Sequence, residues 1–261
     1  MKEVDPTPGN RGPLHAEDAQ LASDLAVAAG ERLLDVRNEN TGIAAAELKD
    51  LGDRSAQELL AAGLARARPN DRVLSEEAAD DRSRLTADRV WIIDPLDGTR
   101  EYSEGRHDWA VHVALWERGE LVAAAVALPG LGTVLRTDPA PVVPPPAGGV
   151  LKMAVSRSRP PALADALVAR LGLQAVPMGS AGYKVAAVVR GEVDLYVHAG
   201  GQYEWDSAAP VAVALAAGLF ASRIDGSPLL YNQEDVLLPD LVVCRRELAD
   251  RVLTTIAEVA A

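Results

Sequence analysis

The spacing of apolar residues divides the first quarter of the chain into two predicted helices. Ala, Leu and Val recur every three or four positions over residues 16–36, and this period predicts a long first helix. The same period over residues 53–67 predicts a second helix, with Asp53 at its start as a capping acid. Residues 38–52 are predicted to be a break, and the polar residues 1–14, with Pro and Gly, are expected to form a flexible terminus.

Short apolar runs then replace the helical period and predict strands. Strands are expected at residues 72–74 and 90–94, and the alternating segment 109–138, with its turn ERGEL, is typical of antiparallel strands. The Pro- and Gly-rich residues 139–149 predict a joint, after which strands and helices alternate. Residues 205–231 are predicted to form a helix followed by a β-hairpin.

This order of elements predicts a fold class. Helices first, then strands, then alternating helices and strands favour a layered α/β (α+β) architecture. We expect an N-terminal α+β sub-domain over residues 15–138, the joint at 139–149 and a C-terminal α/β sub-domain over 150–261.

Composition supports a soluble chain with an aliphatic core. Hydrophobic residues make up 48% of the 261 positions, but only one is Phe. No apolar run reaches the roughly 18 residues of a membrane span, and the N-terminus lacks the apolar stretch of a signal peptide. One cysteine, Cys244, excludes an internal disulfide and a thiolate metal cluster, and its apolar neighbours favour a buried structural thiol. We therefore expect a cytoplasmic protein without a membrane partner.

The net charge of −12 argues against non-specific nucleic-acid binding, which depends on basic patches. The acids either keep the surface soluble or gather into a cation site.

The sequence WIIDPLDGT, residues 91–99, is the strongest candidate for such a site. A buried strand ends on Asp94, and Pro95 stiffens a turn that can aim Asp94, the Leu96 carbonyl and Asp97 at one point. Oxygen ligands of this kind suit Mg2+. Gly98 and Thr99 follow at a predicted helix start, where free N–H groups hold a phosphate. The alternative is a strand, turn and helix in which the acids only cap.

Acidic residues also lie at the ends of two further predicted elements. Glu76 and Glu77 follow the strand at 72–74, and Asp206 begins an apolar helix. Each alone is equally explained by a solvated run or a helix cap. Together with Asp94 and Asp97 they predict a site for two or three Mg2+ ions, which activates water and stabilises the leaving oxygen of a phosphate ester.

These three motifs, LSEE, WIIDPLDGT and WDSAAPVAVALAAG, resemble those of the inositol monophosphatase superfamily of lithium-sensitive, magnesium-dependent phosphatases. The resemblance implies a layered αβαβα sandwich and often a homodimer. It also implies that Thr99 and Asp53 orient the attacking water, that Glu77 acts beside the metals, and that the Gly98 and Thr99 amides hold the phosphate. The threonine that precedes the catalytic acid in the family is absent before Asp53. The implied metal ligands are Glu76, Asp94, the Leu96 carbonyl, Asp97 and Asp206.

The substrate is suggested by a narrower resemblance. Inositol phosphatases carry a glutamate seven residues before the last metal aspartate, where this chain has Ala199. The motifs DPLDGTREY, AVSRSRP, GSAGYK and EWDSAAP are instead similar to the CysQ branch, the 3'-phosphoadenosine-5'-phosphate phosphatases. A second phosphate needs positive charge and hydrogen-bond donors, although a solvated loop and a surface lysine explain some of the same residues. The candidates are Arg100, Ser156, Arg157, Ser158, Arg159, Ser180 and Lys184.

The resulting hypothesis is a phosphomonoesterase that converts 3'-phosphoadenosine 5'-phosphate to AMP and phosphate in sulfate assimilation. Tyr102 and Tyr231 are candidates for stacking on the adenine and equally for surface or packing positions, and no histidine is assigned chemistry. Phosphatases of the same chemistry acting on inositol phosphate, fructose 1,6-bisphosphate or histidinol phosphate remain alternatives. A non-catalytic nucleotide or metal sensor on this scaffold is a third possibility, against which the intact set of acids argues.

Overall fold

Two five-stranded sheets organise the computed structural model, which describes residues 13–146, 148–158 and 160–260. The first sheet has the strand order β1-β2-β3-β4-β5, in which only β1 and β2 are parallel. Its strands are β1 Arg72–Ser75, β2 Arg89–Asp97, β3 Ala110–Glu117, β4 Glu120–Leu128 and β5 Thr133–Arg136. The second has the order β7-β6-β8-β10-β9, in which β6 is parallel to both neighbours and β10 is antiparallel to both of its own. Its strands are β6 Lys152–Ser156, β7 Gln174–Met178, β8 Leu195–Ala199, β9 Phe220–Ser222 and β10 Asp240–Cys244.

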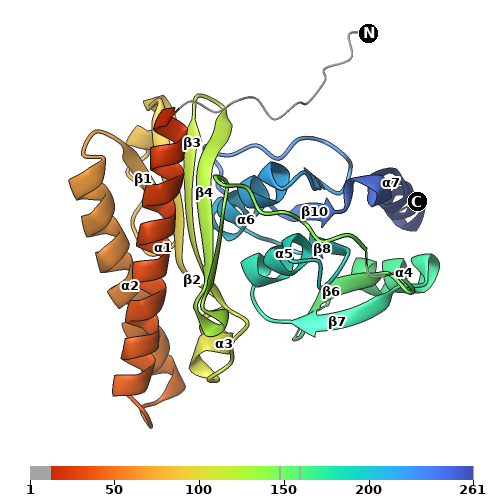
Figure 1. Cartoon of the computed structure of the whole chain (residues 1–261), viewed down its shortest axis with the longest axis horizontal. Helices are drawn as coiled ribbons and strands as arrows, with labels where there is room; N and C mark the ends of the chain where they lie inside the picture. Colours follow the sequence, from red (N-terminus) through yellow and green to blue (C-terminus); the bar gives the residue numbers. More distant parts are fainter. Residues whose placement is uncertain (1–12, 147, 159, 261) are drawn as a thin grey trace.

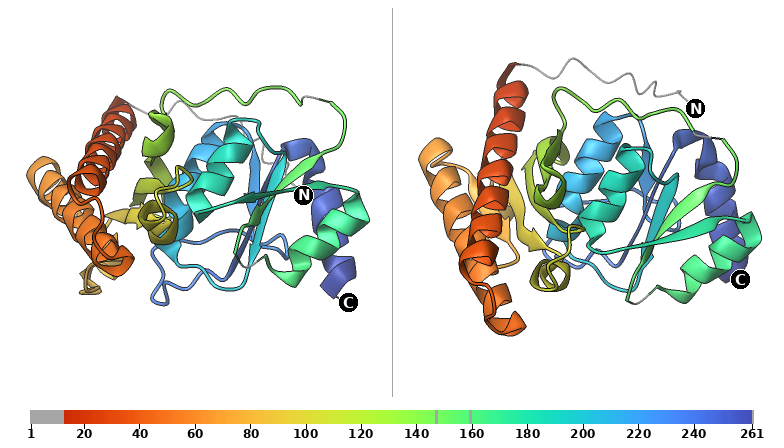
Figure 2. Two further views of the ribbon diagram at one scale, coloured as in Figure 1. Left: turned by 90° about the horizontal axis from the view of Figure 1, so that it is seen from below. Right: turned by 60° about the horizontal axis from the view of Figure 1, so that its bottom comes forward.

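The helices separate and cover these sheets in five layers (Figures 1 and 2). Helices α1 and α2 cover the outer face of the first sheet, α5 and α6 lie between the sheets, and α4 and α7 cover the far face of the second. The short helix α3 follows β2 directly. The expected αβαβα sandwich is therefore confirmed. The helices are α1 Pro13–Glu39, α2 Ala45–Ala67, α3 Thr99–Ser103, α4 Ala162–Leu171, α5 Ala181–Val189, α6 Glu204–Ala216 and α7 Ala249–Ala260, with 3-10 turns at Ser83–Thr86, Pro129–Leu131 and Arg246–Leu248.

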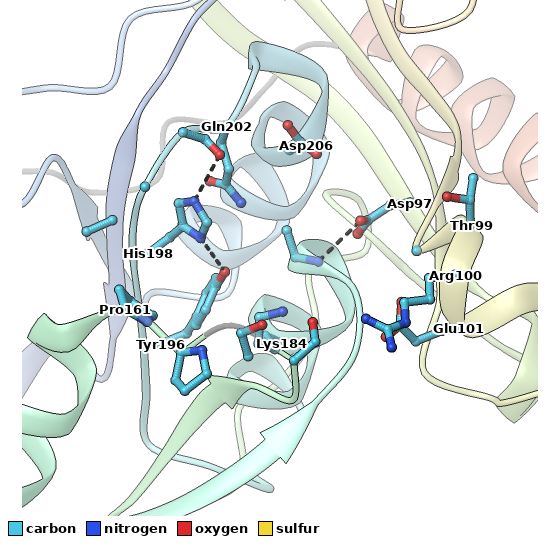
Figure 3. Close-up of a pocket in the computed structure, with 18 residues that line it drawn as sticks. Asp97, Thr99, Arg100, Glu101, Pro161, Lys184, Tyr196, His198, Gln202 and Asp206 are labelled. Atoms are coloured by element: carbon cyan, nitrogen blue, oxygen red, sulfur yellow. Dashed lines mark hydrogen bonds between the residues drawn. The ribbon is translucent and has the colours of Figure 1, made fainter. Parts of the chain in front are cut away.

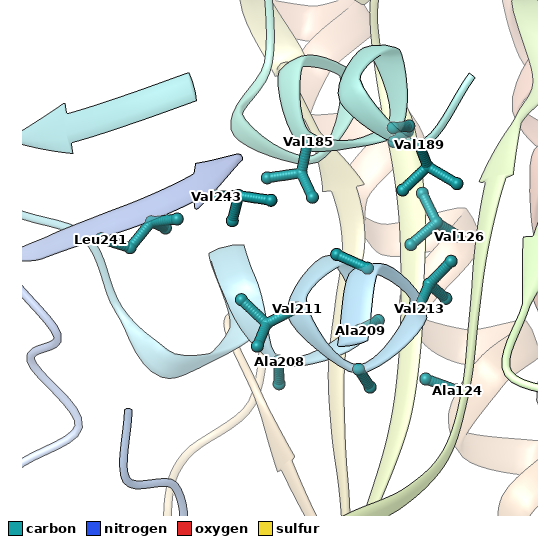
Figure 4. Close-up of a cluster of buried hydrophobic side chains, with 14 of the residues drawn as sticks. Ala124, Val126, Val185, Val189, Ala208, Ala209, Val211, Val213, Leu241 and Val243 are labelled. Atoms are coloured by element: carbon teal, nitrogen blue, oxygen red, sulfur yellow. The ribbon is translucent and has the colours of Figure 1, made fainter. Parts of the chain in front are cut away.

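Each interface between layers is an aliphatic cluster, as the composition predicts. Helices α1 and α2 bury Ala and Leu side chains against one face of the first sheet. Between the sheets, Ala and Val of α5 and α6 pack on small residues of β4 and on Leu241 and Val243 of β10 (Figure 4). The far face of the second sheet buries Cys244 against α7, as its apolar neighbours in the sequence predict, and this burial raises the pKa of the thiol to about 12.

The alternation of side chains along β2 determines which face of the sheet carries Asp94. Trp91 and Ile93 face the α1–α2 layer, whereas Val90 and Ile92 face the α5–α6 layer. The next even-numbered position, Asp94, therefore points toward α5 and α6.

The second helix begins earlier than the sequence predicts, and the expected break at residues 38–52 is mostly helical. Helix α2 starts at Ala45, so Asp53 lies two turns inside it and does not cap it. Gly52, the last residue of the expected break, permits close packing inside the helix, because a Cβ on it would lie 2.9 Å from Cε1 of Tyr102. Tertiary contact thus outweighs the weak helix propensity of glycine.

The predicted hairpin after α6 is wrong. Strand β9 pairs with β10, and no strand forms over residues 223–231. A tight turn does form at Asp225–Ser227, where the Ser227 N–H donates to Asp225 Oδ1 at 2.9 Å. The residues after the turn do not pair with β9, whose only partner in the described sheet is β10.

The described part of the Pro- and Gly-rich joint contains neither helix nor strand and connects the two sheets. The division into two sub-domains at this segment stays a prediction. Among the described helices, none is both long and apolar enough to span a bilayer.

Candidate active site

A bulge near the end of β2 places two acids on one face of the sheet. Asp94 pairs with His112 and Asp97 with Ala110, so three steps along β2 match two along β3. Without the extra residue, positions 94 and 97 would point to opposite faces. Leu96 lies inside the bulge, and its N–H donates to Asp94 Oδ1 at 3.0 Å. The strand thus continues to Asp97 and does not end at Asp94 as predicted.

Helix α6 brings a third acid to the same point. One carboxylate oxygen each of Asp94, Asp97 and Asp206 lies within 4.8 Å of the others. Asp206 sits in the first turn of α6 and accepts a hydrogen bond from the Tyr203 N–H at 2.6 Å. Burial raises the pKa of Asp206 to about 7 and that of Asp94 well above its usual value, and repulsion from neighbouring acids adds to both shifts. Two buried carboxylates and one half-buried carboxylate in mutual repulsion fit a divalent cation.

The N-terminus of α5 holds Asp97 in place from the opposite layer. Its carboxylate accepts hydrogen bonds from the N–H groups of Ala181, at 3.2 Å, and Gly182, at 2.6 Å. Nε2 of the fully buried His112 lies 3.3 Å from the same carboxylate. A Cβ on Gly182 would lie 1.9 Å from that Nε2, so only glycine permits this approach.

Glu76 and Glu77 stand at the rim of the acidic cluster, in the turn after β1. Both residues are exposed, but the Glu76 carboxylate is partly shielded beside Asp94. This partial burial and repulsion from Glu77 raise the Glu76 pKa to about 7. The buried guanidinium of Arg84 binds Asp80 at 2.8 Å and Asn232 at 2.8 Å, which ties the loop that follows Glu77 to the C-terminal half of the chain.

Asp53 faces the acidic turn from α2. Burial, followed by repulsion from Glu77 and Asp50, raises its pKa to about 7. Helix α2 packs closely on α3, whose first residue is Thr99. The structure therefore brings Asp53 to the region of Glu77 and Thr99, although in mid-helix rather than at a cap.

A cavity of about 610 Å³ opens beside the acidic cluster (Figure 3). One wall is the turn from β2 into α3, where Gly98 has φ +95° and a Cβ on it would lie 2.8 Å from Cβ of Ser180. The left-handed conformation and this close contact together require glycine. The remaining walls come from the segment after β6, the start of α5, the end of β8 with the turn after it, and α6; their lining residues are Ser156, Ser158, Pro160, Pro161, Ala181, Lys184, Tyr196, His198, Ala199, Gly200, Gly201, Gln202 and Asp206.

The candidate substrate residues divide into three groups. Gly98, Thr99, Arg100, Ser156, Ser158 and Lys184 line the cavity. Ser180 and Arg157 do not line it. Ser180 caps α5, where its Oγ accepts from the Tyr183 N–H at 2.9 Å, and Arg157 pairs with Glu101 at 2.9 Å and Glu104 at 2.7 Å. Arg159 lies outside the described residues.

Lys184 is buried and not the surface lysine that the sequence allowed. Its Nζ donates to the carbonyl oxygens of Gly179 and Ser180 and lies 5.2 Å from the ring centroid of Tyr196. Burial lowers its pKa to about 8, while Asp97 and other acids oppose the shift. Two of its three donors are committed, so one N–H remains for a ligand in the cavity.

Of the roles considered for the two tyrosines, the structure shows packing and not stacking. Tyr102 is fully buried and donates to the Leu33 carbonyl at 2.8 Å, and Tyr231 is buried beside Ser207, with 3.2 Å between the hydroxyl oxygens. Neither ring lines the cavity, so neither is available to a base there.

Sequence reasoning missed the wall formed by the end of β8 and the turn after it. Tyr196, His198 and Gln202 line the cavity there (Figure 3). His198 lies 3.1 Å from the Tyr196 hydroxyl and 3.2 Å from the Gly201 carbonyl. The carbonyl only accepts, so Nε2 of a neutral ring donates to it and Nδ1 accepts from the tyrosine. The only sequence signal was the pair of glycines shortly before Asp206.

Comparison with known proteins agrees with this geometry. A model of the inositol monophosphatase family matches residues 15–261. The chain is 54% identical over 255 residues to a 3'-phosphoadenosine 5'-phosphate phosphatase of Mycobacterium leprae, covering 93% of this chain and 94% of the relative. It is 56% identical over 239 residues to a protein of the same name from Mycobacterium bovis, covering 88% and 90%.

Solved structures share the fold over most of their length. CysQ from Bacteroides thetaiotaomicron, 26% identical, superposes with a TM-score of 0.77 over 88% of this chain and 98% of its own. An inositol monophosphatase from Zymomonas mobilis, 22% identical, has the same fold with a TM-score of 0.78 over 94% of this chain and 100% of its own. From its motifs, its fold and these matches, the chain belongs to the inositol monophosphatase family.

Proposed function

We propose that the protein is a Mg2+-dependent phosphatase that hydrolyses 3'-phosphoadenosine 5'-phosphate to AMP and phosphate. The observation that carries this proposal is that one cavity is lined both by two acids of the cluster, Asp97 and Asp206, and by the buried cation of Lys184. An acidic cluster serves the phosphate that is cleaved, and a separate cation serves a phosphate that is retained. The names of the two mycobacterial relatives support the same substrate. A role in sulfate assimilation, a cytoplasmic location and a homodimer belong to the same proposal.

The donor set fits Mg2+ rather than a softer ion. Asp94, Asp97 and Asp206 offer only carboxylate oxygens, and neither cysteine nor a histidine nitrogen belongs to the cluster in the part of the chain that the structure describes. Glu76 and the Leu96 carbonyl complete the proposed ligands for two or three ions. These residues would hold Mg2+, which when bound would neutralise charge on the phosphate and make a water more acidic.

The protein groups then perform the remaining steps. Thr99 and Asp53 orient a water in line with the ester bond, and Asp53 accepts its proton. Burial, followed by repulsion from Glu77, keeps the Asp53 pKa at about 7. The water oxygen bonds to phosphorus as the bond to the ribose oxygen breaks, and that oxygen leaves with a proton from solvent. The Gly98 and Thr99 amides at the start of α3 hold the phosphate oxygens during the transfer.

Phosphate release by the purified protein tests this proposal. We expect 3'-phosphoadenosine 5'-phosphate to exceed inositol 1-phosphate, fructose 1,6-bisphosphate and histidinol phosphate by about tenfold or more in kcat/KM, which is about 1.4 kcal/mol. Activity should require Mg2+ and fall with Li+. Equal rates on the sugar phosphates would reject the substrate assignment, and absence of turnover on all four would favour a non-catalytic sensor.

Replacing Lys184 with methionine should selectively weaken use of the two-phosphate substrate. Because a charge-assisted hydrogen bond contributes about 2 kcal/mol, we expect a loss of about 30-fold in kcat/KM for 3'-phosphoadenosine 5'-phosphate. The loss for p-nitrophenyl phosphate, which has one phosphate, should stay within about threefold. Lys152→Met, at an exposed lysine on β6, is the matched control. Equal losses on both substrates would indicate that Lys184 only stabilises the N-terminus of α5.

A further inference from the structure

Gln202 is the most conspicuous polar side chain in the cavity wall without an assigned role. It is 4% exposed, and neither its Oε1 nor its Nε2 has a hydrogen-bond partner among the described residues. Its side chain lies between His198 and Asp206 (Figure 3). Buried amides normally make such bonds, since an unpaired one loses its hydration without compensation.

The backbone around Gln202 is fixed on both sides. The preceding carbonyl, that of Gly201, lies 3.2 Å from His198 Nε2. The Gln202 carbonyl accepts from the Leu238 N–H at 2.7 Å, and the next N–H, that of Tyr203, donates to Asp206 at 2.6 Å. These bonds fix the backbone of Gln202. Rotation about its side-chain bonds is then enough to turn the amide into the cavity.

The bond from Tyr203 to Asp206 also places Gln202 relative to the chemistry. The Asp206 carboxylate belongs to the acidic cluster, so Gln202 is one residue from a group that touches that carboxylate. This wall and two acids of the cluster line the same cavity, so the leaving group of a phosphate ester bound at the cluster can reach the wall. An amide carries both donors and an acceptor, so it pairs with a hydroxyl in either direction.

We propose that Gln202 is a specificity-determining residue that hydrogen-bonds a hydroxyl on the carbon next to the ester, which is the 2'-hydroxyl in a ribose 3'-phosphate. This inference deepens the proposed function and rests on it for the identity of the sugar. Selection against leaving groups without that hydroxyl then arises because they leave the buried amide unpaired.

The test pairs a change in the protein with a change in the substrate. Wild type and Gln202→Leu are each assayed with 3'-phosphoadenosine 5'-phosphate and with its 2'-deoxy analogue. We expect wild type to prefer the hydroxyl-bearing substrate by about tenfold in kcat/KM, the worth of one uncharged hydrogen bond. In Gln202→Leu that preference should fall about tenfold relative to wild type. Comparing the two ratios cancels the effect of the hydroxyl on the intrinsic reactivity of the ester.

Two controls separate this role from a structural one. Activity on p-nitrophenyl phosphate should change less than about twofold, and the melting temperature of Gln202→Leu should not fall, because no protein bond to the amide is lost. Gln174→Leu, at an exposed position of β7, is the matched control. An unchanged preference for the 2'-hydroxyl in Gln202→Leu, or an equal loss on all substrates, would overturn the inference.

The outcome remains readable if the proposed substrate is wrong. Should wild type prefer inositol 1-phosphate, the same comparison is made between inositol 1-phosphate and cyclohexyl phosphate, which lacks the neighbouring hydroxyl. Loss of that preference in Gln202→Leu would support the role of Gln202 and reject only 3'-phosphoadenosine 5'-phosphate as the substrate. Retention of the preference would reject both the role of Gln202 and the proposed substrate.

Discussion

Asp94→Asn should lower kcat/KM by about a thousandfold or more, an increase of about 4 kcal/mol in the barrier. Asp94 is 1% exposed and lies at the centre of the acidic cluster, so its replacement removes a ligand charge that no neighbouring side chain can supply. Steady-state phosphate release at saturating Mg2+ measures the loss. Retention of more than about a tenth of wild-type activity would exclude Asp94 as a metal ligand.

The same substitution should stabilise the metal-free protein. Repulsion from Glu76, Asp97 and Asp206 adds to burial in raising the Asp94 pKa, and a neutral amide removes that repulsion. Melting temperature in a chelator should therefore rise, by about 2–4 °C for each kcal/mol of repulsion relieved in a chain of this size. Added Mg2+ should raise the melting temperature of wild type more than that of Asp94→Asn, which separates loss of metal binding from loss of fold.

The raised pKa values also determine the pH range in which Mg2+ increases the melting temperature most. Asp206 and Glu76 have folded pKa values of about 7, above their ordinary values near 4, so the folded metal-free protein binds more protons than the unfolded chain. Their contribution to stability is fully present below about pH 4 and is lost as the pH rises through 7. Mg2+ needs the deprotonated ligands. The gain in melting temperature on adding Mg2+ should therefore be larger at pH 8 than at pH 5.5, and the reverse order would contradict the assignment of these acids as ligands.

The sequence predicts the parts of this site that depend on local pattern. A buried strand that runs into Asp94 and Asp97, and a helix that opens on Asp206, are both readable along the chain, and the structure brings the three carboxylates together. The five layers follow from the order of elements and from the family resemblance. The bulge that turns Asp97 onto the face of Asp94 has no local signal, because it is defined by pairing with β3.

Long-range contacts explain the failures. The break expected over residues 38–52 is mostly helix because Gly52 packs against Tyr102, and Lys184 is buried because α5 lies between the two sheets. Tyr102 was a candidate for stacking, but its hydroxyl binds a carbonyl of α1. The unpaired amide of Gln202 is recognisable only once its surroundings are known. Residue type thus identifies candidate ligands, whereas burial and partners decide which are available.

Asp53→Asn should reduce kcat by about a hundred- to a thousandfold and change KM little, because a general base acts on the transition state more than on substrate binding. Asp53 lies on α2, outside the group formed by Asp94, Asp97 and Asp206. The rise in melting temperature on adding Mg2+ should therefore be retained, unlike in Asp94→Asn. Asp50→Asn, at an exposed acid one turn earlier on the same helix, should stay within about twofold of wild type.

These two readouts together distinguish a base from a ligand. The Asp53 pKa of about 7 suits a group that must be deprotonated to accept a proton near neutral pH. Loss of turnover together with loss of the Mg2+ effect would place Asp53 among the metal ligands. Near-normal turnover would mean that Thr99 and the acidic cluster activate the water without Asp53. The absence of the family's threonine before Asp53 would then agree with an Asp53 that is not catalytic.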